Sequence, residues 1–156
     1  MSEEENVEAT IEEKARELRE RVDIGALGTV GEGGHPYTSL VEVVVDEQGD
    51  FWMLLSDLAV HSENLKRDGR ASLLLHDPES GEEDGRRLAT VRATFVGEVE
   101  RIDEPGQKRR ERYLEAHPEA EQWMGFSDFS MYRLKVEKTR VVAGFGRIGW
   151  IESGEQ

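Results

Sequence analysis

Apolar residues recur with two different spacings along the chain, and the two spacings predict different kinds of element. Between Val7 and Val22 an apolar residue stands at every third or fourth position, which predicts an amphipathic helix with a solvated face of Glu and Arg. Apolar and β-branched runs predict strands at 26–30, 37–45, 51–55, 71–75, 88–99, 131–136 and 140–145, the last extended by 149–151. The turn-forming residues at 46–50 predict a hairpin between two of these strands.

Helical segments are predicted between the strands as well. We expect a short polar helix after Ser56, a charged helix at 105–116, and a short helix or irregular link at 117–126. About six strands with these helices predict a mainly β fold, a closed or nearly closed antiparallel barrel with flanking helices. The length of 156 residues suits one domain. We expect a disordered acidic tail at 1–6 and a single domain over 7–156.

Composition narrows the classes of partner. The formal net charge is −14, which argues against nucleic acid, because binding it requires a basic surface. The cations are 15 Arg and 5 Lys, a bias that suits a high-salt cytoplasm or an ordinary acidic protein. No cysteine is present, which excludes disulfides and thiolate metal sites. The N-terminus lacks the pattern of a signal peptide, and no apolar run is long enough for a membrane span, so we expect a cytoplasmic location.

The segment from Ser56 to Leu75 is the strongest candidate for a binding site. It predicts a strand end, a helix start and a new strand, with four hydrogen-bonding side chains at the junction: Ser56, His61, Ser62 and Asn64. A helix N-terminus offers unpaired N–H groups and a partial positive charge, so the junction suits a phosphate. Structural alternatives exist for three of them: Ser62 as a helix cap, Asn64 bonded to nearby backbone, and His61 exposed to solvent.

Two later features fit the same site. Arg92 stands inside an apolar strand, where it forms either a surface salt bridge or a charge partner for that phosphate. The sequence Gly144-Phe145-Gly146-Arg147 matches half of a dinucleotide-binding fingerprint, but no βαβ unit accompanies it, so it does not indicate a Rossmann fold. Its glycines predict a bulged strand end, or a backbone that a flat ligand can approach closely.

The sequence gives little support for a metal site or for catalysis by side chains alone. His35, His76 and His117 have no second histidine or acid at metal-ligand spacing, so no metal site is predicted. No Ser-His-Asp arrangement can be argued, and paired carboxylates such as Glu12-Glu13 fall in charged surface runs. If the protein is an enzyme, a cofactor is expected to carry the chemistry.

Three stretches together resemble a known superfamily. LLSDLAVHSENLKRDGRASLLL, VRATFVGEVE and FSDFSMYRLKVEKTRVVAGFGRIGWI resemble the pyridoxamine 5′-phosphate oxidase-related FMN-binding split-barrel superfamily, and most closely its HugZ-type branch. The resemblance covers roughly residues 10–151. It implies a six-stranded antiparallel split barrel that forms a homodimer with FMN at the interface.

The resemblance also assigns site residues. It implies that the FMN phosphate is held by Ser56, His61, Ser62, Asn64 and Arg92. The strand at 37–41 would lie along the flavin ring with Thr38 and Ser39 nearest, and Phe145 and Arg147 would reach in from the partner subunit.

The chain departs from two members of the superfamily. The C-terminal GWIESGEQ differs from the longer motif of vitamin B6 oxidases, and no histidine follows His117 to match the iron ligand of HugZ-type proteins. Our first hypothesis is therefore an FMN-dependent oxidoreductase acting on an unknown small molecule. The alternatives are a non-catalytic haem or flavin carrier or sensor, a haem-degrading HugZ-type protein, and a barrel kept only for protein interaction.

Overall fold

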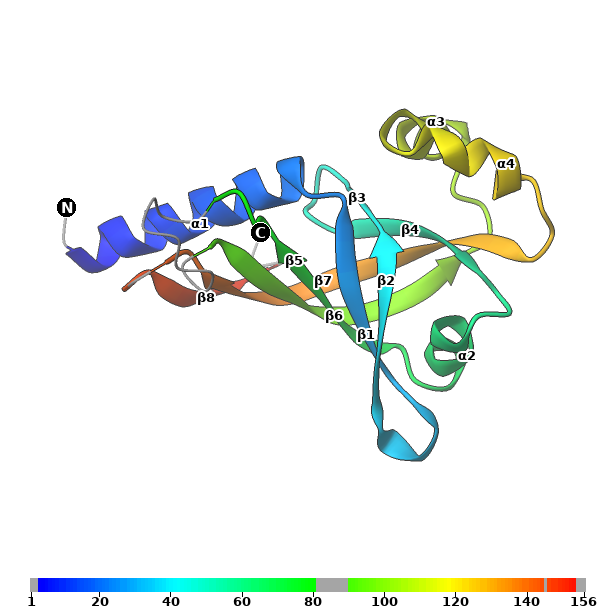
Figure 1. The fold of residues 1–156 in the computed structure, drawn as a ribbon, viewed down its shortest axis with the longest axis horizontal. Coiled ribbons are helices and arrows are strands. Elements are labelled where there is room, and N and C mark those ends of the chain that lie inside the picture. The colour runs from blue at the N-terminus through cyan, green and yellow to red at the C-terminus, as the bar shows by residue number, and fades with distance from the viewer. Residues whose placement is uncertain (1–2, 81–89, 145, 154–156) are drawn as a thin grey trace.

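The strands of the chain form one curled antiparallel sheet. The computed structural model describes residues 3–80, 90–144 and 146–153. The eight strands follow the order β2-β1-β5-β6-β7-β4-β3, with β8 paired to β7 (Figure 1). Their bounds are β1 Ile24–Val30, β2 Pro36–Glu42, β3 Val44–Val45, β4 Phe51–Ser56, β5 Arg70–His76, β6 Arg92–Ile102, β7 Phe129–Val142 and β8 Ile148–Glu152. The predicted mainly β, split-barrel fold with flanking helices is confirmed.

Helices cover the ends of this sheet. Their bounds are α1 Glu3–Arg21, α2 Val60–Arg67, α3 Gln107–Ala116 and α4 Glu121–Met124, with short 3-10 turns η1 at Glu32–Gly34 and η3 at Pro118–Ala120. Helix α1 lies along one end of the molecule, and α3 and α4 lie at the other (Figure 1). Among the described residues, no helix combines the length and the apolar character needed to cross a membrane.

The strands differ from the roughly six predicted, because one predicted run divides, two join, and 148–152 forms a strand of its own. The predicted strand 37–45 divides at Val43, whose amide donates to the Asp23 carbonyl at 2.8 Å, so β2 pairs with β1 and β3 pairs with β4. The predicted strands 131–136 and 140–145 are one strand, β7, and β8 folds back on it.

A bulge explains why β7 resembled two strands in the sequence. The pairing of β6 with β7 shifts register between Val96 and Gly97, and Glu137 is the extra residue on β7. Glu137 and Lys138 are therefore both exposed, which interrupts the alternation of apolar and polar residues without ending the strand. Gly97 permits this close approach, because a Cβ there would lie 1.9 Å from the Lys135 carbonyl oxygen.

The core has two parts, on opposite faces of β4. Phe51, Met53 and Leu55 point into the barrel, where the rings of Phe51 and Phe95 pack edge to face with centroids 4.7 Å apart. Trp52 and Leu54 point outward and pack beneath α3 and α4. This burial on both faces accounts for the unbroken apolar run of β4.

Candidate functional site

The curled sheet leaves a seam between β2 and β4. These strands lie side by side, but no ladder joins them in the described part of the chain, since β2 pairs only with β1 and the second half of β4 pairs only with β7. A cavity of about 380 Å³ lies along the seam. Its walls are mostly apolar, and its lining comprises Leu40, Val41, Glu42, Leu54, Leu55, Ser56, His61, Tyr113, Trp123 and Phe129.

The junction between β4 and α2 places His61 in this cavity. Strand β4 ends at Ser56, and the next residue, Asp57, accepts hydrogen bonds from Ser130 Oγ at 2.8 Å and Tyr132 Oη at 2.6 Å. The Ser62 hydroxyl donates to the Ser56 carbonyl oxygen at 2.6 Å. These contacts hold the first turn of α2 against the strand end, and so orient the intervening His61.

His61 is the most unusual polar group of the cavity. Its Nε2 is buried and has no hydrogen-bond partner among the described residues. Burial lowers the pKa of His61, because the low-dielectric surroundings disfavour the imidazolium. His61 therefore presents a neutral imidazole to an apolar space. Such a group binds a metal centre or accepts a hydrogen bond from a ligand.

A second buried polar group without a partner lies on β2. The Ser39 hydroxyl has no hydrogen-bond partner within the described ranges of the chain. Ser39 is on the same face of β2 as Val41, which lines the cavity. Buried polar groups are normally hydrogen-bonded, so these two exceptions make the region a candidate binding site.

Ser62 and Asn64, both predicted to bind phosphate, are fully buried and bonded within the protein. Asn64 Nδ2 donates to Thr29 Oγ1 at 3.0 Å, and its Oδ1 accepts from Arg67 at 2.7 Å, so Asn64 ties α2 to β1. Ala59 is the N-cap of α2 and no side chain caps the helix there, so the alternative that Ser62 is the cap is wrong.

The remaining predicted residues lie away from this junction. Arg92 pairs with Val142 and Ser56 pairs with Phe129, so they flank opposite ends of the 14-residue strand β7, roughly 45 Å apart along the strand. Arg92 donates to the Thr90 carbonyl at 3.2 Å. Thr38 is exposed on β2, Arg147 follows the turn from β7 to β8, and Phe145 lies outside the described residues. Within one chain the structure does not bring Arg92 to the junction, and the cofactor roles of all these residues remain predictions.

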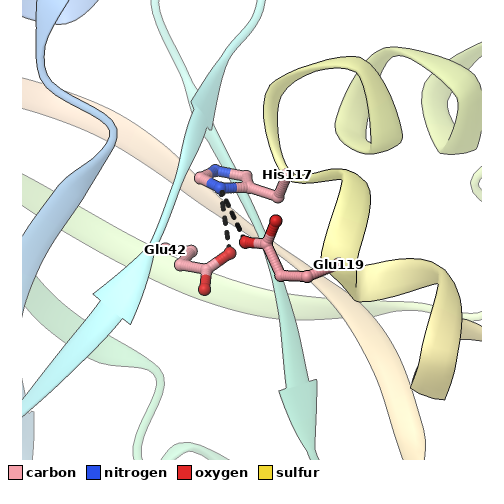
Figure 2. A group of neighbouring side chains, drawn as sticks. All are labelled: Glu42, His117 and Glu119. Carbon is pink, nitrogen blue, oxygen red and sulfur yellow. Dashed lines mark ion pairs between the residues drawn. The ribbon is translucent and has the colours of Figure 1, made fainter.

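The fold assembles one cluster that the sequence analysis missed. Glu42, His117 and Glu119 converge beside the cavity (Figure 2). His117 Nδ1 lies 2.9 Å from Glu42 Oε2 and 4.0 Å from Glu119 Oε1. Burial raises the pKa of Glu42, and His117 partly opposes this effect. In the sequence, the only sign of this cluster near His117 was the carboxylate of Glu119 two residues later. Glu42 could not be linked to it, because it belongs to a strand distant in the sequence.

These features define a class of protein. A curled antiparallel sheet with an open seam and flanking helices is a split barrel, and the predicted resemblance to the HugZ-like branch of the pyridoxamine 5′-phosphate oxidase-related superfamily is confirmed. The chain belongs to the CREG β-barrel family, whose model matches residues 7–156.

Two named relatives are haem oxygenases. The chain is 33% identical over 124 residues to the chloroplastic non-canonical haem oxygenase HOZ of Arabidopsis thaliana, covering 78% of this chain and 36% of that protein. It is 25% identical over 150 residues to haem oxygenase HutZ of Vibrio cholerae, covering 92% of this chain and 82% of HutZ. The chain thus spans about a third of the Arabidopsis relative.

Solved structures agree with this placement. A haem-binding protein from Mycobacterium smegmatis is 31% identical, with a TM-score of 0.79 over 90% of this chain and 57% of that one. A Clostridium acetobutylicum protein related to general stress protein 26, of the pyridoxinephosphate oxidase family, is 18% identical with a TM-score of 0.69, over 92% of this chain and 94% of that one. The second likeness concerns the fold alone.

Proposed function

We propose that this chain binds haem in the cavity between β2 and β4, with His61 as the iron ligand. The observation that carries the proposal is that His61 lines an apolar cavity, while its buried Nε2 has no hydrogen-bond partner among the described residues. A proximal histidine is a common axial ligand of haem iron. The names of the Arabidopsis, Vibrio and Mycobacterium relatives support the same ligand class.

The other walls of the cavity suit a flat apolar macrocycle. Leu40, Leu54, Trp123 and Phe129 provide apolar and aromatic surface, and the cavity volume is within the roughly 300–1,000 Å³ of small-molecule sites. Bound haem would supply a redox-active iron. The side chains of this protein would ligate the iron, orient the ring and limit the access of water.

Titration of the purified apoprotein with haemin tests the proposal. We expect a Soret band that saturates at a fixed stoichiometry, with the spectrum of a histidine ligand. A band that rises without saturation, like that of haemin adsorbed to an unrelated acidic protein, would contradict haem binding. Adding ascorbate in air then separates two activities: loss of the Soret band indicates haem degradation, and its persistence indicates a carrier or sensor.

FMN is the second candidate cofactor, favoured by the superfamily and by the unpartnered Ser39 hydroxyl. FMN ranks below haem for two reasons. Ser62 and Asn64 make hydrogen bonds within the protein, and Arg92 of β6 pairs with the end of β7 that lies away from the junction. Quenching of flavin fluorescence on titration would support FMN. Bleaching of the bound flavin by NADH or NADPH without air, reversed by oxygen, would support a flavin oxidoreductase.

A homodimer that covers the seam is also part of this proposal. Leu40 and Leu58 are 77% and 75% exposed, and Leu40 borders the cavity. A second copy over this surface would bury both leucines. Light scattering should give twice the chain mass, and Leu40→Glu should reduce that mass. A cytoplasmic location remains a prediction.

A further inference from the structure

The cluster beside the cavity contains a histidine whose ring is oriented by a backbone contact. His117 ends α3 and begins η3, and its side chain is 4% exposed. Its Nε2 lies 3.0 Å from the Val43 carbonyl oxygen. A carbonyl oxygen only accepts hydrogen bonds, so Nε2 carries a proton. Nδ1 is therefore the ring nitrogen that faces the carboxylates of Glu42 and Glu119 (Figure 2).

Three atoms that can each ligate a metal ion therefore lie close together. The ligand atoms of Glu42, His117 and Glu119 all lie within 4.8 Å of one another. One proton between His117 Nδ1 and Glu42 Oε2 would satisfy that pair, but Glu119 would still bring a second carboxylate toward the first. A divalent cation would satisfy all three donors and neutralise both carboxylates.

The spacing of the donors suits a small cation. Bonds of about 2.0–2.1 Å in a tetrahedral site place ligand atoms roughly 3.3 Å apart. The observed distances from His117 Nδ1, 2.9 and 4.0 Å, lie on either side of that value. The longer one involves Glu119, whose side chain is half exposed and can move without disturbing the core.

The surroundings of His117 match those of a metal ligand. Histidines that bind metals commonly donate their other ring N–H to a backbone carbonyl, which sets the ring orientation, and His117 makes this contact with Val43. Glu42 comes from β2, and His117 and Glu119 come from the start of η3, so two distant parts of the chain position the three donors. The net charge of −14 raises the local concentration of cations.

We propose that Glu42, His117 and Glu119 form a binding site for one divalent transition-metal ion. The imidazole favours Zn²⁺ or Co²⁺ over Mg²⁺ and Ca²⁺, which prefer all-oxygen ligands. Three protein ligands leave at least one coordination position for water or a small anion. The site does not depend on the haem proposal, because none of its donors is needed to ligate haem.

Calorimetric titration of the haem-free, chelator-treated protein with ZnCl₂, in about 150 mM salt to screen the acidic surface, tests the proposal. We expect one Zn²⁺ per chain. Glu42→Gln and Glu119→Gln should each weaken binding by about tenfold or more, since each removes a ligand charge. Glu121→Gln is the matched control: it removes an exposed carboxylate two residues from Glu119 and should leave the affinity unchanged.

Co²⁺ provides a second measurement that does not depend on heats. The wild-type protein and Glu121→Gln should develop visible absorption bands of low-symmetry Co²⁺, and Glu119→Gln should not. Glu119 is exposed, so this variant keeps the fold. Binding that is non-saturating, unaffected by both ligand substitutions, or displaced equally by Mg²⁺ would overturn the proposal, because each result indicates diffuse attraction to the acidic surface.

Discussion

The hydroxyl of Ser62 donates a 2.6 Å hydrogen bond to the carbonyl oxygen of Ser56. This contact joins the end of β4 to the first turn of α2, and His61 lies between the two residues in sequence. Because Ser62 is fully buried, its hydroxyl has no access to water as an alternative partner. The bond therefore stabilises the fold and orients the imidazole of the cavity.

Ser62→Ala should lower the free energy of unfolding by about 0.5–1.5 kcal/mol, because it removes this hydrogen bond, while the Ser56 carbonyl keeps the Ala59 amide as a donor. Urea unfolding followed by circular dichroism measures the change. Ser127→Ala, at an exposed position, serves as the control and should change stability by less than about 0.5 kcal/mol. Equal stabilities of the two variants would show that the Ser62 bond contributes little.

His61→Ala should weaken haem binding by about tenfold or more, equivalent to ~1.4 kcal/mol, and should shift the Soret band. The reason is the loss of the nitrogen assigned to the iron. Free imidazole should restore the band, since it can occupy the vacated space. His76→Ala, which removes an exposed histidine from β5, should leave the spectrum unchanged. An unaltered spectrum in His61→Ala would remove this residue as the iron ligand.

Stability should depend on pH through His61. Its pKa in the folded protein is lowered by burial from the ordinary value of 6.5. Between these two pKa values the unfolded chain binds a proton that the folded chain does not, so the free energy of unfolding falls as the pH drops below 6.5. Urea titrations across this range should show a smaller decrease for His61→Gln than for the wild type. Identical decreases would contradict the burial of the imidazole.

Gly97→Ala should be among the most destabilising single changes on the sheet. The added Cβ would lie 1.9 Å from the Lys135 carbonyl oxygen, a backbone atom held in the β6–β7 ladder. We expect a loss of at least about 1–3 kcal/mol, typical of overpacking, measured by thermal or urea unfolding. Gly125→Ala is the control, because a Cβ there meets nothing within 4 Å and its φ is −89°. Similar stabilities for the two variants would argue against the bulge at Gly97.

The part of the candidate site that is formed by residues close together in the sequence was predictable. Ser56 and His61 are five residues apart, on a strand end and a helix start that the hydrophobic pattern already indicated, and both line the cavity. Ser62 and Asn64 belong to the same junction, but sequence could not distinguish side chains that face a ligand from side chains that hold the helix in place. That distinction depends on Thr29 and on the Ser56 carbonyl, which the packing of α2 brings within reach.

The pattern of apolar residues by itself determined that this is a mainly β protein with a helix at its start and a polar junction after β4. It did so because burial on one or both faces of an element leaves a periodic trace in the sequence. Only the tertiary structure decided that β7 is one strand, that Arg92 lies far from Ser56 along β7, and that Glu42 meets His117. The physical reason is that these relations depend on how the sheet curls and where its register shifts. His117 and its backbone partner Val43 are 74 positions apart, and no local preference records such a contact.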